Sequence, residues 1–264
     1  MFGPALLFCP ADRPERYAKA AAAADTVIID LEDAVSAADR PAARVALAES
    51  SLDPARTIVR VNPVSTDDFE RDLTALAQTD YATVMLAKTE QRADAAMLAD
   101  YRVVAICETA LGVQNAAEIA AADNVFALMW GAEDLVASLG GTSSRDLRGG
   151  YRDVARYARS RVLIAAAAHG KHAVDTVHLD IPDIDGLRAE AEDAVASGFA
   201  GTACIHPSQV PIIRSAYAPT AEELRWAAGV LSAAESERGV FRFEGRMIDE
   251  PILRQARRIL RRTP

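Results

Sequence analysis

Residues 103–134 read VVAICETALGVQNAAEIAAADNVFALMWGAED. Two short apolar runs, 103–107 and 125–130, flank an alanine-rich segment that lacks strand alternation, and an acidic residue follows each run closely. Near-continuous apolar runs are typical of strands buried on both faces of a parallel sheet, and the intervening segment is typical of a helix. The stretch therefore predicts one strand–helix–strand unit of an α/β fold.

The same unit recurs along most of the chain. We predict eight strands, at residues 5–9, 26–31, 57–61, 83–87, 103–107, 125–130, 174–179 and 202–205. Helices are expected between them, at 14–24, 40–50, 66–79, 91–98, 112–122, 152–169 and 185–197. Eight alternating units, with no G-x-G-x-x-G after the first strand, favour a closed (β/α)8 TIM-type barrel over an open doubly wound sheet.

The chain continues for about 58 residues (264 − 206) after the eighth strand. We predict a helix over 220–236, a short extended piece at 240–243 and a final helix over 251–262. A barrel does not need this segment. We therefore divide the chain into a barrel domain, residues 1–218, and a C-terminal helical extension, residues 219–264.

Composition excludes several classes of protein. The net charge of −9 argues against nucleic acid as the main partner, because proteins that bind nucleic acid concentrate positive charge. No apolar run reaches the ~20 residues that cross a bilayer, so no membrane partner is expected. Cys9, Cys107 and Cys204 lie far apart in apolar runs and are interpreted as reduced packing residues, which indicates a cytoplasmic protein.

Acidic residues stand at the predicted carboxyl ends of several strands, where barrels of this type carry their active sites. Crowded carboxylates without cysteine or paired histidine ligands suit a hard cation, above all Mg²⁺. Glu108 and Asp134, on consecutive strands, are the best candidate ligands, and Glu32 and Asp33 are placed to hold the waters of the metal. The alternative for these acids is helix capping or pairing with nearby arginines.

Basic residues occur at the same ends. Arg60 lies inside an apolar strand and needs an anionic partner, either a carboxylate of the ring or an anionic substrate group, and its position favours the substrate. For Lys88, binding of a phosphate or carboxylate is favoured over Schiff-base chemistry. Arg13, Arg16 and Lys19 cluster at the start of a helix, where anions bind, although a solvated helix face is the alternative for each.

Seven motifs occur in order along nearly the whole chain: FCPADRPER (8–16), IIDLED (28–33), RVNP (60–63), ET (108–109), GAED (131–134), CIHPSQ (204–209) and GRMID (245–249). This ordered set resembles the citrate lyase β-subunit-like branch of the aldolase/citrate lyase family, relatives of malyl-CoA and citramalyl-CoA lyases. The resemblance implies a (β/α)8 barrel with Mg²⁺ on Glu108 and Asp134. It also implies that Arg60 binds substrate oxygens, that the ligand is a coenzyme A thioester, and that the protein is a homotrimer.

The resemblance gives the C-terminal extension a role. In the lyase relatives this segment covers the barrel of a neighbouring subunit and delivers an aspartate, which corresponds to Asp249 here. From the sequence alone, Asp249 is also a candidate N-cap of the last helix, with Pro251 close behind, and the two roles are compatible.

The implied reaction is Mg²⁺-dependent, reversible cleavage of a β-hydroxyacyl-CoA into an acyl-CoA, such as acetyl-CoA, and a small α-keto acid. In that reaction Arg60 and Asp249 are the expected catalytic residues. The expected substrate contacts are Arg60, Glu108, Arg13, Arg16, Lys19 and Lys88. Three alternatives stay open: a citrate lyase β subunit acting on a citryl thioester, a malate synthase-like or thioesterase activity, and a non-catalytic acyl-CoA-binding subunit.

Overall fold

The computed structural model describes residues 3–237 and 239–262 of the chain. Contacts between residues divide the chain into two compact units, Met1–Ile213 and Arg214–Pro264, and each is described by itself. Over the described ranges, none of the helices combines the length and the apolar character that a membrane crossing requires.

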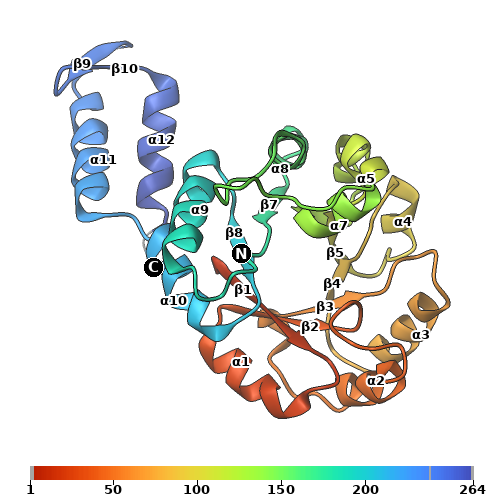
Figure 1. Ribbon diagram of the computed structural model, residues 1–264. Coiled ribbons are helices and arrows are strands. Elements are labelled where there is room, and N and C mark those ends of the chain that lie inside the picture. The colour runs from red at the N-terminus through yellow and green to blue at the C-terminus, as the bar shows by residue number, and fades with distance from the viewer. Residues whose placement is uncertain (1–2, 238, 263–264) are drawn as a thin grey trace. The chain divides into compact units, whose positions relative to one another are not determined.

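Eight parallel strands of the first unit close into a barrel in chain order, with β8 hydrogen-bonded to β1 (Figure 1). The strands are β1 (Ala5–Pro10), β2 (Thr26–Asp30), β3 (Thr57–Val61), β4 (Thr83–Leu86), β5 (Arg102–Cys107), β6 (Val125–Trp130), β7 (His172–Asp175) and β8 (Gly201–Cys204). Helices surround this barrel, so the predicted (β/α)8 fold is confirmed.

Helices and short 3₁₀ turns connect the strands. They are η1 (Pro14–Arg16), α1 (Tyr17–Ala23), α2 (Arg40–Ala48), η2 (Pro54–Arg56), α3 (Asp67–Leu76), α4 (Arg92–Ala96), α5 (Ala110–Gln114), α6 (Ala116–Ala120), α7 (Ala132–Ser138), α8 (Asp153–Ala168), α9 (Ile184–Ser197), η3 (Pro207–Gln209) and α10 (Val210–Tyr217). The sequence prediction missed α7 and α10.

Side chains from every strand fill the inside of the barrel. The cluster consists of Leu6, Ile28, Ile58, Met85, Val104, Ile106, Ala127, Met129, Val174 and Ala203. Every residue of β2 is buried, because one face of the strand points into this cluster and the other lies under the helices. This packing explains why the strands read as unbroken apolar runs rather than as alternating ones.

Two predicted elements differ from the structure. The predicted strand 174–179 is wrong at both ends, because β7 spans His172–Asp175. Beyond it, the backbone N–H of Thr176 donates to the carboxylate of Asp175 at 3.0 Å, so this N–H is not available to a strand ladder. The predicted helix 112–122 is broken at Asn115, whose side-chain amide donates to the carbonyl of Glu90 at 2.9 Å.

The second unit is a pair of helices joined by a β-hairpin. It comprises α11 (Ala221–Ala234), β9 (Phe241–Phe243), β10 (Arg246–Ile248) and α12 (Glu250–Leu260). The hairpin turns through Glu244 and Gly245, both at positive φ, which is the geometry that two-residue hairpin turns favour. The sequence predicted β9 but not β10, because the turn contains only one glycine. An apolar cluster centred on Ala227, Val230 and Ile248 holds the unit together.

Candidate active site

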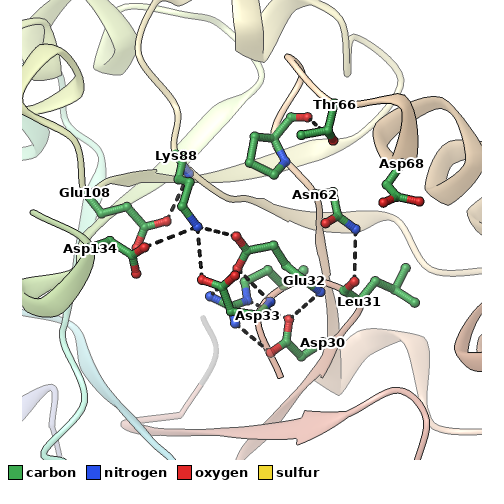
Figure 2. Close-up of polar contacts among 12 residues, drawn as sticks. Asp30, Leu31, Glu32, Asp33, Asn62, Thr66, Asp68, Lys88, Glu108 and Asp134 are labelled. Carbon is green, nitrogen blue, oxygen red and sulfur yellow. Dashed lines mark hydrogen bonds and ion pairs between the residues drawn. The ribbon is translucent and has the colours of Figure 1, made fainter. Parts of the chain in front are cut away.

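Five carboxylates gather at the carboxyl ends of barrel strands β2, β5 and β6 (Figure 2). Asp30 ends β2 and is followed by Glu32 and Asp33, Glu108 follows β5, and Asp134 lies in the first turn of α7 after β6. Asp134 is therefore on a helix rather than on a strand as predicted. The barrel nevertheless brings the predicted acids into one network, because parallel strands present their carboxyl ends on the same side.

Lys88 connects most of these acids. It follows β4, and its ammonium makes ion pairs with Glu32, with Asp33 at 3.0 Å and with Asp134 at 3.2 Å (Figure 2). The backbone N–H of the same residue donates to Glu108 Oε1 at 3.0 Å. Burial works against the ammonium charge, but the surrounding carboxylates outweigh it and raise the pKa of Lys88. The residue is therefore a cation, not a neutral amine ready to form a Schiff base.

Glu108 is more deeply buried than Asp134, the other predicted metal ligand. Its exposed fraction is 3%, whereas the side chain of Asp134 is 32% exposed. Burial, together with the negative charge of Asp134, raises the pKa of Glu108 to about 8. The two carboxylates therefore repel each other in a poorly solvated place, and a cation between them would relieve that repulsion.

Arg60 is held rigidly by acids of the neighbouring strand. Asp30 and Arg60 are partners in the register of β2 and β3, and the guanidinium donates to both oxygens of Asp30 at 2.7 and 2.6 Å. A third contact joins Arg60 to Glu32 at 3.1 Å, and the guanidinium lies 4.8 Å from the centre of the Phe8 ring. Of the two partner types considered from the sequence, the carboxylates are present in the structure, and the substrate contact stays a prediction.

A second polar network supports the loop that carries Glu32 and Asp33. The side-chain amide of Asn62 donates to the carbonyl of Leu31 at 2.9 Å and to Asp72 at 2.7 Å (Figure 2 shows the Leu31 contact). Asp72 also accepts from the backbone N–H of Asn62 at 2.9 Å and from Arg44 at 2.7 Å. These buried bonds fix the end of β2, and therefore the acids that follow it, against α3 and α2.

Gly131 leaves room for the carboxylate of Glu108. A Cβ at this position would overlap Glu108 Oε2 and would lie 2.9 Å from the Cβ of Glu108. The backbone of Gly131 is extended, with φ −121°, so an alanine would meet a steric obstacle and not a conformational one. The glycine is therefore part of the site, as a space kept for the acid.

We expect Gly131→Ala to displace the Glu108 carboxylate, to lower the free energy of unfolding by about 1–3 kcal/mol and to weaken binding of Mg²⁺. Urea unfolding and calorimetric Mg²⁺ titration measure the two effects. Gly150→Ala is the matched control, because the nearest atoms to its Cβ would be 3.8 Å away. Wild-type Mg²⁺ affinity in Gly131→Ala would contradict this account.

The donor set fits a hard divalent cation. Glu108 and Asp134 offer carboxylate oxygens only, and Mg²⁺ is commonly held by one or two carboxylates together with waters and substrate oxygens. Clusters of three or more potential Asp, Glu, His or Cys ligands are not found among the residues that the structure describes. The pKa of Glu108 is raised by burial and by the negative charge of Asp134, so a cation held by this pair would offset the charge of both.

The sequence profile of the HpcH/HpaI aldolase/citrate lyase family matches residues 5–207. The chain belongs to this family. The citrate lyase subunit beta-like protein of Mycobacterium tuberculosis is 60% identical over 260 residues, which cover 98% of this chain and 95% of the relative. The mitochondrial citramalyl-CoA lyase of Rattus norvegicus is 30% identical over 290 residues, covering 97% of this chain and 84% of that enzyme.

A solved structure is also similar over nearly the full length of the chain. The crystal structure of CitE from M. tuberculosis in complex with magnesium, acetoacetate and coenzyme A has a TM-score of 0.96 and 60% identity. The match covers 98% of this chain and 97% of that one. The family resemblance predicted from the ordered motifs is confirmed.

The other residues predicted for the site are Arg13, Arg16, Lys19 and Asp249. Arg13 and Arg16 are exposed beside Asp12 and Glu15, at 3.6 and 3.8 Å, and Lys19 is exposed on α1. In the second unit, Asp249 is the N-cap of α12, and its side chain accepts from the backbone N–H of Ile252 at 3.3 Å. The capping role considered from the sequence is therefore present, and the catalytic role stays a prediction.

The roles of three residues of the candidate site were not predicted from the sequence. Asp30 anchors Arg60, and Asn62 supports Leu31. Gly131 leaves space for Glu108. All three roles depend on contacts between different strands. Asp30 and Arg60 each end or nearly end a strand, and consecutive parallel strands of similar length place such residues side by side. That pairing was the available signal for Asp30.

Proposed function

We propose that this chain is a Mg²⁺-dependent carbon–carbon lyase that interconverts a β-hydroxyacyl-CoA with an acyl-CoA, such as acetyl-CoA, and a small α-keto acid. The observation that carries the proposal is the pair Glu108 and Asp134 at the barrel mouth, with Arg60 and Lys88 in the same network. Support comes from the similarity to a protein solved with magnesium, acetoacetate and coenzyme A.

Glu108 and Asp134 would hold the metal, and Glu32 and Asp33 would accept hydrogen bonds from its waters. When bound, Mg²⁺ supplies Lewis-acid polarisation of the carbonyl oxygen of the keto acid. Arg60, already fixed by Asp30 and Glu32, donates hydrogen bonds to a substrate oxygen on which negative charge develops. Because its guanidinium is held on two sides, it loses little freedom when the substrate binds.

Asp249 moves the proton at the α-carbon of the acyl-CoA, as general base when the enolate forms and as general acid when it collapses. We propose that it acts from the C-terminal extension within a homotrimer. Arg13, Arg16, Lys19 and Lys88 are the proposed cationic contacts for the anionic groups of the coenzyme A ester and the keto acid. Analytical ultracentrifugation measures the oligomeric state.

The direct test is incubation of the purified protein and Mg²⁺ with acetyl-CoA and propionyl-CoA against a small panel of α-keto acids. We expect condensation to a β-hydroxyacyl-CoA with at least one pair, and cleavage of the same product in reverse. Mass spectrometry of the thioesters separates this outcome from hydrolysis, which releases free coenzyme A. A protein that binds coenzyme A esters and Mg²⁺ but neither forms nor breaks a C–C bond would contradict the proposal.

The apparent affinity for Mg²⁺ is expected to rise with pH and to level off above about pH 8. The pKa of Glu108 is about 8, so below that pH its carboxyl is protonated, and metal binding must release the proton. With one proton released, each pH unit below the pKa lowers the apparent affinity about tenfold. Calorimetry in buffers with different ionisation enthalpies measures the released proton, and a constant affinity from about pH 6 to 9 would contradict this assignment.

A further inference from the structure

Lys88 is in contact with both proposed metal ligands at once. Its backbone has φ 49°, and Lys88 and Glu244 are the two non-glycine residues at positive φ in the described part of the chain. In this conformation the backbone N–H donates to Glu108 Oε1 at 3.0 Å, while the side chain reaches Asp134 Oδ1 at 3.2 Å. An unfavourable backbone conformation at a functional site persists only where surrounding contacts determine it.

The ammonium of Lys88 has three carboxylate partners. Besides Asp134, it contacts Glu32 and Asp33, the latter at 3.0 Å (Figure 2). The ammonium donates hydrogen bonds to Glu32 and Asp33, and its contact with Asp134 is an ion pair. The side chain is 29% exposed, which leaves the amine partly shielded from solvent and strengthens its attraction to the acids.

The groups around the Lys88 amine carry an excess of negative charge, which a cation stabilises. The network holds five carboxylates and two cations, a balance of 2 − 5 = −3 when all are ionised; its members are Asp30, Glu32, Asp33, Glu108, Asp134, Arg60 and Lys88. Arg60 is committed to Asp30 and Glu32. The ammonium of Lys88 is thus the cation that stands directly against Asp134.

We propose that Lys88 is the internal counter-ion of the metal site: its ammonium holds Glu32, Asp33 and Asp134 together before the metal binds, and it competes with Mg²⁺ for the negative charge of Asp134. The inference rests on the proposed function, in which Glu108 and Asp134 bind the metal. Mg²⁺ and the ammonium repel each other, so the metal loosens the ion pair with Asp134. The released positive charge then faces the mouth, where an anionic keto acid would bind.

The test compares Mg²⁺ binding to wild type, Lys88→Met and Lys88→Arg by isothermal titration calorimetry, each at a pH above which its own affinity no longer rises. Each protein needs its own pH, because Lys88 lowers the pKa of Glu108 and its removal raises that pKa. Removal of the competing charge is expected to strengthen Mg²⁺ binding about fivefold to tenfold in Lys88→Met. Without metal, Lys88→Met is expected to melt at a lower temperature than wild type. Addition of Mg²⁺ is expected to raise its melting temperature more than that of wild type. Lys88→Arg keeps the charge and should bind Mg²⁺ close to the wild-type affinity.

Lys171→Met is the matched control, because Lys171 precedes β7 at the amino end of that strand and donates to the carbonyl of Ala122 at 3.2 Å. Its Mg²⁺ affinity should equal that of wild type. Unchanged or weaker Mg²⁺ binding in Lys88→Met, with normal binding in wild type, would overturn the inference and leave the proposed function standing. Absence of Mg²⁺ binding in wild type would overturn both.

Lys88→Gln is a second neutral variant, used in case Lys88→Met does not fold, because glutamine keeps hydrogen-bond donors without the charge. Circular dichroism then follows each neutral variant with and without Mg²⁺. Recovery of the fold by Mg²⁺ alone supports the counter-ion role, because the metal then replaces the missing charge. Neutral variants that stay unfolded in saturating Mg²⁺ overturn it, because Lys88 would then serve the fold itself rather than the charge balance of the site.

Discussion

Glu108→Gln will abolish metal-dependent turnover while leaving the metal-free protein folded. The pKa of Glu108 is about 8, so near neutral pH the carboxyl is largely protonated, and the neutral amide of glutamine resembles that form in size and charge. Glutamine is a far weaker ligand for Mg²⁺ than a carboxylate. Removal of a residue that only hydrogen-bonds to a metal ligand typically lowers metal affinity or activity about 10- to 100-fold. Removal of a direct ligand is therefore expected to lower Mg²⁺ affinity and turnover by more than about 100-fold.

Calorimetric Mg²⁺ titration and the condensation assay measure this loss, and thermal unfolding without metal measures the retained fold. Asp134→Asn is expected to behave in the same way. Glu118→Gln is the matched control, because Glu118 is an exposed acid on α6, outside the network. Full turnover in both Glu108→Gln and Asp134→Asn would remove the basis of the proposed metal site.

Asp249→Asn is expected to lower the lyase rate by about 10²- to 10⁴-fold, the range that a positioned general acid or base contributes. Asparagine and aspartate are about equally good N-caps, so the variant keeps the bond to the N–H of Ile252 and the start of α12. The change therefore separates the proton-transfer role from the capping role. Single-turnover kinetics and exchange of the α-proton of acetyl-CoA into deuterated water measure the affected step.

Thr220→Ala provides the structural control, because Thr220 caps α11 in the same unit as Asp249. Loss of that cap should cost about 1 kcal/mol of stability and leave the rate near that of wild type. An Asp249→Asn variant with the wild-type rate would show that Asp249 serves only as a cap, even in a protein with full lyase activity.

Much of the barrel was predictable because the signal for each strand is local. A parallel strand under helices is buried on both faces, so run 125–130 is apolar throughout, and run 57–61 is apolar apart from Thr57 and Arg60. The bounds of the two runs match β6 and β3. The positions of Glu108 and Asp134 followed from the same reasoning, since the residues after such runs face the mouth of a barrel.

Elements with mixed signals were predicted poorly. β7 contains His172 and Asp175, and its length depends on neighbours: Asp175 accepts from Trp130 of β6 at 2.6 Å and from Arg159 of α8. β10 was missed because it forms by pairing with β9 across a turn with one glycine and one glutamate at positive φ. In both cases, residues outside the segment decide its conformation.

The sequence by itself determined the eight strands, their closure into a barrel, the family, and the gathering of acids at one end. The tertiary structure decided the partners within that gathering. Lys88 and Glu32 are 56 positions apart, and Arg60 and Asp30 are 30 apart, so neither ion pair leaves a local pattern in the chain. Composition and periodicity report what each segment buries. Which cation meets which carboxylate depends on strand register and on the positive φ of Lys88, and these arise only when the barrel closes.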